Sequence, residues 1–505
     1  MSVVLHLSRS ALLVLTALLC AGVVGCAPAQ VSFTCDEGEP LCDLVAIMND
    51  DRPAATGIDI SDVYLYQGSE VPLMESLVGA GEPEIPIVAG RYAMVRVFVE
   101  PHEDFEPREL TGRLYLYRDN VAFAAFQMDA QVNGSSSAGE YGSSFNFVVP
   151  GEVIIPGVSW MASVVEISKG AGGNEADGIA SWPDGFGQPL SVTEGVAKVR
   201  VLLVPVRYDA DGSGRLPDTS EAAVELYRDT MYSQYPAAEM EMVVGDEFAW
   251  SSTISASGSG WSELLSAVGQ ARDTVGAEDD MYVYGLFEPA ADFNTYCSGG
   301  CVTGLSNLVG SATDIWSRAS IGVGYGGGTS AETMVHEVGH AHGRDHVDGG
   351  CGSGGGDSEY PHEGGVIGVR GYNWRTDSLV DPDSTWDFMT YCSPTFLSDH
   401  NFRKLYTRVT AVSNAYYALG PSVPYWGLSQ LDDGRLIWGP DRDLRVPPGG
   451  LTKTVELLDA SGRAIRKIDA FFAPFAGLPG GQLSFPAPGP SVAAVRIDGR
   501  VSPIR

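Results

Sequence analysis

The chain has 505 residues, of which 31 are basic and 64 acidic, so its formal net charge at pH 7 is −33. This charge would repel a polyanion and argues against nucleic acid as a partner. The length exceeds what one hydrophobic core serves and suggests roughly three domains.

Residues 1–25 have the features of a signal peptide for export. Arg9 supplies a positive charge, and residues 11–24 form an apolar stretch shorter than a typical membrane span. The stretch ends in Val-Val-Gly before Cys26, which resembles the lipobox of bacterial lipoproteins and implies a lipidated Cys26. An ordinary secretory signal is the alternative. We therefore expect an exported lipoprotein of the bacterial cell envelope or surface, held to the membrane by this lipid alone, with release from the cell as a further fate.

Six cysteines remain when Cys20 and Cys26 are set aside. They are Cys35, Cys42, Cys297, Cys301, Cys351 and Cys392. An even number of cysteines in an oxidising compartment predicts disulfide bonds. Proximity in sequence favours the pairs Cys35–Cys42 and Cys297–Cys301, which leaves Cys351 with Cys392. Zinc binding by cysteines is the weaker interpretation, because no Cys-x-x-Cys pair occurs.

Residues 26–54 are expected to form a tether, and residues 55–195 a domain of β-strands. Short apolar runs rich in β-branched and aromatic residues, such as 92–99 and 145–149, alternate with turn residues. Helical periodicity is absent from this region. The pattern predicts a β-sandwich.

Residues 196–418 are expected to form an α+β domain. A buried strand at 199–204 precedes helices predicted at 220–233 and 261–272, and a third helix is predicted after Ser398. Alternating strands and helices are typical of a layered domain.

Residues 419–505 return to short strands and are expected to form a small C-terminal β-domain. Asp433-Gly434, Ser461-Gly462 and Asp498-Gly499 are hairpin-turn dipeptides. The predicted fold class is therefore multidomain, with an α+β domain flanked by all-β, sandwich-like domains.

The segment from Val335 to His346 carries three histidines and a glutamate. His336 and His340 are four residues apart, so on a helix both imidazoles project from one face and can share a cation. Residues 329–332, Thr-Ser-Ala-Glu, resemble a capping box and predict the helix start. Glu337 follows the first histidine, where it would contact a water on the metal rather than the metal itself.

Gly343 can adopt positive φ, so we expect it to end this helix and turn the chain towards His346. Three histidine ligands with an open fourth position are typical of a catalytic zinc site. The full spacing, His-Glu-x-x-His-x-x-Gly-x-x-His, is the metzincin signature. The alternative is an ordinary surface helix with clustered histidines. His342 lies outside the pattern and is expected beside the site or at the surface.

A second segment, residues 387–392, supports the same interpretation as the histidine motif. Metzincins carry a methionine turn beneath the zinc, and residues 387–392 follow the third histidine at a suitable distance. Met389 would form an apolar floor under the histidines. Tyr391 matches a position where some metzincins place a tyrosine that stabilises an oxyanion, and a packed core aromatic is the alternative. Cys392 could join Cys351 and fix the intervening loop to this turn.

The run from Thr329 to Tyr406 resembles the catalytic region of the dictomallein and secreted-mucinase group of bacterial metzincins. Besides the zinc motif, residues 365–372 and 388–392 carry this resemblance. It implies a zinc-dependent endopeptidase that acts on proteins or glycoproteins, with Glu337 as general base. The alternative is a catalytically inactive binding or adhesion lipoprotein, and the presence of Glu337 favours activity.

Two further segments carry open interpretations. Residues 321–325 could be an edge strand that pairs with an extended substrate, or a plain sheet edge that leads into the glycines at 326–328. Residues 209–216 partly fit a calcium-binding EF-hand loop, but position twelve is Ser220 rather than Glu. A turn that caps the next helix is the favoured interpretation of this loop, with Ca²⁺ as the alternative.

Overall fold

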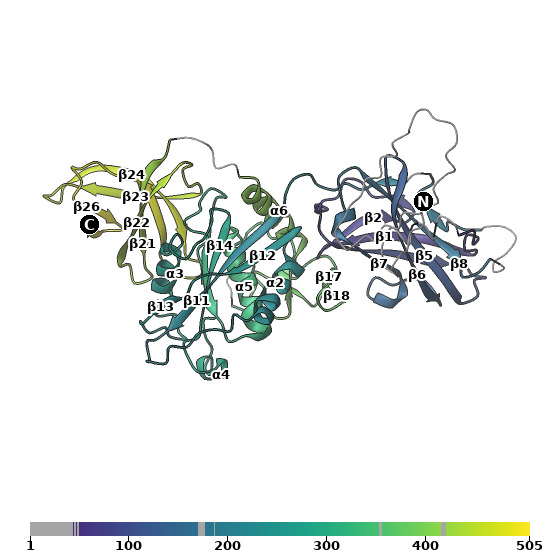
Figure 1. Cartoon of the computed structure of the whole chain (residues 1–505), viewed down its shortest axis with the longest axis horizontal. Helices are drawn as coiled ribbons and strands as arrows, with labels where there is room; N and C mark the ends of the chain where they lie inside the picture. Colours follow the sequence, from purple (N-terminus) through teal and green to yellow (C-terminus); the bar gives the residue numbers. More distant parts are fainter. Residues whose placement is uncertain are drawn as a thin grey trace, which may run out of the picture.

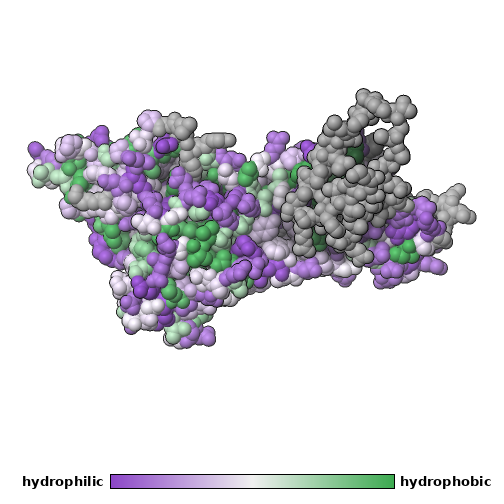
Figure 2. Space-filling model, viewed as in Figure 1, coloured by the Kyte–Doolittle hydropathy of each residue, from purple (hydrophilic) through white to green (hydrophobic). Residues whose placement is uncertain are grey.

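The computed structural model describes Leu44, Ile47 and residues 50–169, 177–185, 187–352, 356–415 and 421–504. The signal segment, Cys26 and the predicted Cys35–Cys42 pair lie outside these residues. The described chain forms three parts in a row (Figure 1), which we call the N-terminal, central and C-terminal parts. None of the described helices is both long enough and apolar enough for a membrane span. Hydrophilic residues prevail on the face shown in Figure 2.

The N-terminal part is all-β and consists of two five-stranded antiparallel sheets. The first has the order β3-β2-β1-β4-β7, with strands β1 Ile58–Tyr66, β2 Glu70–Glu75, β3 Val78–Gly79, β4 Ala93–Pro101 and β7 Phe145–Val149. The second has the order β10-β8-β5-β6 with β9 beside β8, and its strands are β5 Arg108–Arg118, β6 Val121–Val132, β8 Val158–Glu166, β9 Ser181–Trp182 and β10 Gln188–Pro189. Buried residues of both sheets belong to one hydrophobic cluster, as expected for a sandwich.

The central part is built on a six-stranded mixed sheet of order β12-β11-β14-β16-β15, with β13 beside β11. Its strands are β11 Lys198–Tyr208, β12 Glu239–Val244, β13 Phe248–Trp250, β14 Met281–Phe287, β15 Gly304–Ser306 and β16 Ala319–Val323. Neighbouring strands are parallel except β15, which is antiparallel to β16 and lies at the edge. The prediction of an edge strand at 321–325 is therefore wrong, because β16 is paired on both sides.

Helices cover both faces of this sheet because its strands are apolar on both sides. In β11, Val201 and Leu203 pack on the side of helix α5, whereas Leu202 and Val204 pack on the side of helix α3. The described α-helices of the central part are α2 Glu221–Gln234, α3 Trp261–Gln270, α4 Phe293–Tyr296, α5 Gly327–Ala341 and α6 Asp399–Ser413. The helices predicted at 220–233, at 261–272 and after Ser398 are confirmed.

The start of α5 differs from the prediction. The helix begins at Gly327 with Gly326 as its N-cap, and no side chain caps it. Residues 329–332 already lie inside the helix, so they do not form a capping box. Gly326 and Gly327 have φ of +77° and +72°, which lets the chain turn into the helix three residues before the predicted N-cap, Thr329.

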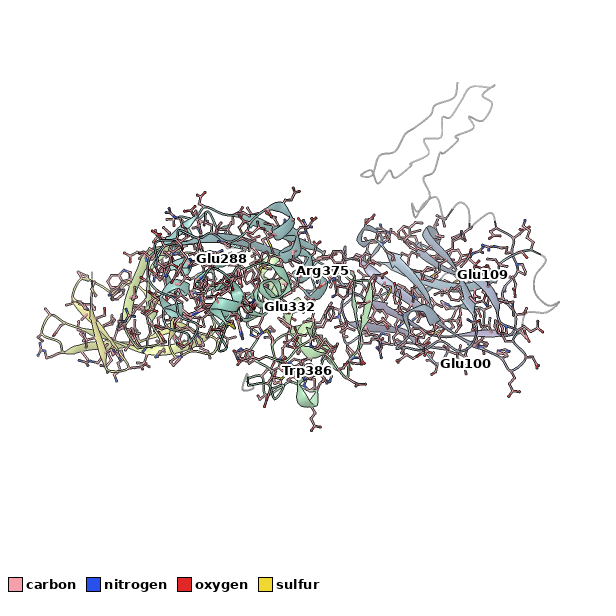
Figure 3. The ribbon with its side chains drawn as sticks, turned by 90° about the horizontal axis from the view of Figure 1, so that it is seen from below. Glu100, Glu109, Glu288, Glu332, Arg375 and Trp386 are labelled. Atoms are coloured by element: carbon pink, nitrogen blue, oxygen red, sulfur yellow. A yellow bond between two sulfur atoms is a disulfide. The ribbon has the colours of Figure 1, made fainter. Side chains whose placement is uncertain are left out.

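The chain between α5 and α6 forms two short strand pairs, β17 Gly371–Asn373 with β18 Ser378–Val380, and β19 Trp386–Asp387 with β20 Thr395–Phe396. In Figure 3, Arg375 from the turn of the first pair lies between the N-terminal sheets and α5, close to Glu332. The Arg370 carbonyl accepts a hydrogen bond from the Glu70 N–H at 2.9 Å. This segment thus joins the N-terminal and central parts.

The C-terminal part is a seven-stranded antiparallel sheet of order β22-β21-β25-β24-β23-β26-β27 with its own hydrophobic cluster. Its strands are β21 Val423–Gln430, β22 Leu436–Leu444, β23 Leu451–Leu458, β24 Ala464–Pro474, β25 Gly481–Pro486, β26 Ala494–Ile497 and β27 Arg500–Pro503. Gly434, Gly462 and Gly499 all have positive φ in the turns between strands. The three predicted hairpin turns are confirmed.

Two predicted disulfides are present, Cys297–Cys301 and Cys351–Cys392. The loop at 209–216 forms a tight turn closed by a bridge between Tyr208 and Arg215. The Asp211 carboxylate pairs with Arg215 at 2.7 Å and accepts a hydrogen bond from the Ser213 N–H, so it is engaged within the turn. Helix α2 is capped by the Ser220 hydroxyl instead of by this turn.

Candidate metal centre

Helix α5 carries two of the three histidines and is fixed against the sheet by its apolar face. Met334, Val335 and Val338 are fully buried in the cluster that also contains Tyr284 of β14. His336 and His340 are four residues apart, so they lie on a common face of the helix, one turn from each other.

Helix α5 ends at Ala341, just before Gly343, as expected from the glycine. Gly343 has φ of +80°, and a β-carbon there would lie 2.7 Å from the Val309 carbonyl oxygen, so only glycine fits. The Arg344 N–H donates to the Gly339 carbonyl at 2.9 Å, which closes the helix end. The chain then brings His346 back towards the two helical histidines.

The three imidazoles converge through their Nε2 atoms. Nε2 of His340 lies 3.2 Å from Nε2 of His336 and 3.1 Å from Nε2 of His346. Zinc bound tetrahedrally with Zn–N bonds of about 2.0–2.1 Å would hold its ligand nitrogens about 3.3 Å apart. This cluster could hold a metal ion, and in the described part of the chain it is the one group of at least three potential ligands.

Backbone carbonyls orient two of these rings. Nδ1–H of His336 donates to the Phe388 carbonyl at 2.7 Å, and Nδ1–H of His340 donates to the Arg344 carbonyl at 2.6 Å. With Nδ1 protonated for this bond, Nε2 carries the lone pair that a metal requires. The donor set therefore fits a metal in tautomer as well as in distance.

Burial also sets the charge of the site. It lowers the pKa of His336 to about 4 and the pKa of His340 well below its ordinary value. Burial lowers the pKa of the His346 imidazole as well. All three rings are thus neutral at pH 7, the state in which imidazole binds a metal.

Glu337 lies beside the histidines but outside their cluster. It is buried, and burial raises the pKa of its carboxyl to about 8. A β-carbon on Gly304 of β15 would collide with the Glu337 carboxylate. The carboxylate therefore lies directly against the edge strand, in a place that exists only because residue 304 has no side chain.

The turn after β19 supplies the floor of the site. Met389 is fully buried, and its Sδ lies 2.8 Å from where a β-carbon on Gly339 would be. Asp387 fixes this turn, since its Oδ1 accepts from the Met389 N–H at 2.8 Å and from Asn401 Nδ2 at 2.9 Å. Met389 thus packs under the helix that carries His336 and His340.

Tyr391 lies beside the histidines, on the solvent-exposed side of the site. Its side chain is 54% exposed, so the alternative of a packed core aromatic is wrong. Its ring centroid lies 5.0 Å from that of His346 and 5.7 Å from that of His336. Partial burial, together with the charge of Glu337, raises the pKa of its phenol to about 12, so the phenol keeps its proton at neutral pH.

His342 is buried in the core. It lies neither at the surface nor among the three clustered histidines. Its ring stacks on Tyr282 of β14 with centroids 3.9 Å apart, and its Nδ1–H donates to the Val338 carbonyl at 2.8 Å. Burial lowers the pKa of this imidazole to about 3, which keeps it neutral. The residue fills the space between α5 and the sheet.

The sequence analysis missed three contributors to the site. Gly304 and Asn401 lie outside every motif, and Gly477 comes from the C-terminal part, where a β-carbon would lie 3.7 Å from both His346 Cε1 and the Tyr391 hydroxyl. Gly304 lies in a three-residue strand, Asn401 in helix α6 and Gly477 in the connection between β24 and β25. Each reaches the site through tertiary contacts, for which the sequence has no local signal. No protein-family model matches the chain, and no curated protein matches it.

Proposed function

We propose that this protein is an exported, zinc-dependent endopeptidase of the metzincin type that hydrolyses peptide bonds of proteins or glycoproteins. One observation carries the proposal: the three Nε2 atoms converge, with neighbouring atoms 3.1 to 3.2 Å apart, beside a buried carboxylate and a strand edge. Three imidazole ligands leave one zinc position open, and zinc held there supplies a Lewis acid that activates water near neutral pH.

Glu337 is the general base in this proposal. Its carboxylate takes the proton from the attacking water and then passes it to the nitrogen of the leaving amine. Burial raises the pKa of Glu337 and makes its carboxylate a stronger base than an exposed one, and a zinc ion nearby would favour the charged form that accepts the proton.

Tyr391 and strand β15 act on the substrate. The Tyr391 hydroxyl keeps its proton at neutral pH, so it can donate to the oxygen of the scissile carbonyl as negative charge develops there. Strand β15 pairs with β16 on one side only, and an extended peptide can add to its other side beside Glu337.

The metal supports a direct test. The purified protein should contain about one zinc per chain and cleave an unfolded protein, and a chelator should stop cleavage until zinc is restored. His340→Ala should lose the zinc, because two imidazoles bind it far more weakly than three. Stoichiometric zinc in a triple alanine variant of His336, His340 and His346 would place the metal elsewhere and contradict the proposal.

The location proposed for this activity is the bacterial cell envelope, through a lipid on Cys26. Wild-type protein should then partition with membranes, and Cys26→Ser should release it, because several acyl chains hold a protein firmly. A wild-type protein with an unmodified N-terminus in the soluble fraction would contradict this location while leaving the enzymatic proposal standing.

A further inference from the structure

A segment of the C-terminal part lies on the strand edge beside the histidines. Residues 474–480 connect β24 to β25 and reach across to the chain that follows β15. The Leu308 N–H donates to the Pro474 carbonyl at 2.8 Å, and the Ala476 N–H donates to the Ser306 carbonyl at 2.8 Å. This is an antiparallel bridge between Asn307 and Phe475. The C-terminal part therefore pairs with the edge of the central sheet through one antiparallel bridge.

Beyond this bridge the segment passes over the candidate metal centre. Phe475 is 4% exposed and packs in the cluster that contains Leu305 of β15, and Leu478 packs against the same cluster. Gly477 lies between these two anchors and is exposed, with its β-carbon position 3.7 Å from His346 and from the Tyr391 hydroxyl. The segment therefore approaches His346 at a residue that has no side chain.

We propose that residues 474–480 are an internal pseudosubstrate, which occupies the strand edge where a substrate peptide must pair; this inference rests on the proposed function. Addition of a strand to a sheet edge is a common mode of peptide recognition. The segment Pro-Phe-Ala-Gly-Leu-Pro-Gly contains no residue that ligates zinc. It therefore competes with substrate and leaves the metal ligands unchanged.

The occupied length of edge also indicates what a competing substrate looks like. The segment covers Ser306–Leu308, and β15 retains Gly304 next to Glu337 for a further residue of a bound chain. A substrate that replaces the segment is an extended, unfolded stretch with a small residue over His346. Two residues before it, an apolar side chain fills the place of Phe475.

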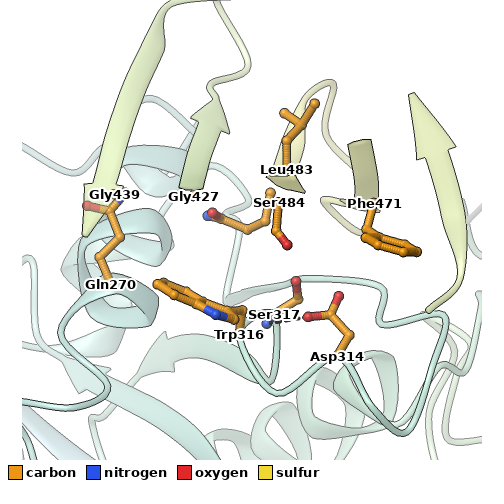
Figure 4. A pocket seen from close by; sticks show the side chains of 10 residues that line it. Gln270, Asp314, Trp316, Ser317, Gly427, Gly439, Phe471, Leu483 and Ser484 are labelled. Carbon is orange, nitrogen blue, oxygen red and sulfur yellow. Dashed lines mark hydrogen bonds between the residues drawn. The ribbon is translucent and has the colours of Figure 1, made fainter. Parts of the chain in front are cut away.

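The contact between the C-terminal and central parts is suited to release of the segment. Figure 4 shows Gln270, Trp316 and Ser317 of the central part facing Leu483 and Ser484 across a cavity of about 10 Å³. In the described chain, Trp316 Nε1 and Ser484 Oγ have no hydrogen-bond partner there. Polar contacts between domains are of the kind that permits the domains to move relative to each other.

The test compares variants of the full chain. Ala476→Pro removes the N–H that bonds Ser306, and Phe475→Ala removes the buried anchor. Ala487→Pro is the matched control, because it removes one N–H that bonds the Pro424 carbonyl elsewhere in the C-terminal part. The probe is a fluorescent peptide with the sequence of residues 472–481, titrated into zinc-loaded protein that also carries Glu337→Ala and cannot cleave it.

Ala476→Pro should bind this peptide about 2- to 12-fold more tightly than the control, as expected for one lost hydrogen bond. Phe475→Ala, which loses the buried anchor, should also bind it more tightly than the control. Hydrogen exchange at the Leu308 N–H should accelerate in the same two variants. In proteins that retain Glu337, KM for a short peptide should fall by a similar factor with kcat unchanged. Peptide affinity equal to or weaker than that of the control would overturn the pseudosubstrate, even if all proteins cleave. Tighter peptide binding with no cleavage by any protein would support the pseudosubstrate as a ligand of this edge and overturn the proposed function alone.

Discussion

At the scale of single residues, the site depends on a glycine, Gly304, as well as on the side chains of the histidines and of Glu337. Glu337 keeps its place because Gly304 leaves room for the carboxylate on the edge strand. The metal ligands are held separately, by the carbonyls of Phe388 and Arg344. Base and ligands can therefore be perturbed independently.

Gly304→Ala should displace the Glu337 carboxylate and leave the zinc in place. A shift of about 1 Å in a reacting group can cost about 100-fold in rate, so we expect kcat/KM to fall by about 10- to 100-fold. Steady-state kinetics and zinc content measure the two effects. Gly489→Ala is a suitable control, because nothing lies within 4 Å of a β-carbon there. Full activity of Gly304→Ala would contradict the placement of Glu337.

At the scale of elements, helix α5 and the turn that carries Met389 must stay in register. The Cys351–Cys392 disulfide joins the loop after His346 to this turn across 41 residues of sequence, whereas Cys297–Cys301 spans 4. In the chain-entropy account, a disulfide stabilises more when it closes a longer loop. The first disulfide therefore matters more for the site.

Replacement of Cys351 and Cys392 by serine should lower the free energy of unfolding by about 4 kcal/mol, and the same change at Cys297 and Cys301 by about 2 kcal/mol. Denaturant unfolding of zinc-free protein measures both values. Zinc affinity should weaken only in the first variant, because only that disulfide reaches the turn under the histidines. An equal loss of zinc affinity in both variants would refute this assignment.

The elements differ in how far sequence could predict them. The spacing from His336 to His346 predicts a helix and a turn by local geometry, and the structure brings the three rings together accordingly. The edge strand was misplaced to residues 321–325, because the three-residue strand β15 has no periodicity and its position depends on pairing with β16. Gly304 and Asn401 reach the site through such tertiary contacts, which no local pattern encodes.

At the scale of the molecule, both flanking parts make specific contacts with the central part. Arg91 of the N-terminal part is buried and donates to the carbonyls of Tyr232 and Ala237 near α2, at 2.6 and 2.8 Å. The C-terminal part reaches the histidines themselves through Gly477. A site assembled from distant parts of the chain was beyond sequence analysis, which treated the C-terminal strands as a separate domain.

The central claim, that this site hydrolyses peptide bonds with Glu337 as the base, is tested most directly by digestion of a denatured proteome with wild-type and Glu337→Ala protein. Both proteins should contain equal zinc, because Glu337 is not in the ligand cluster. Wild-type protein should generate new N-termini at defined positions. Glu337→Ala should generate them about 100- to 10,000-fold more slowly, since a general base typically contributes this factor to the rate. Equal cleavage by the two zinc-loaded proteins would contradict the account.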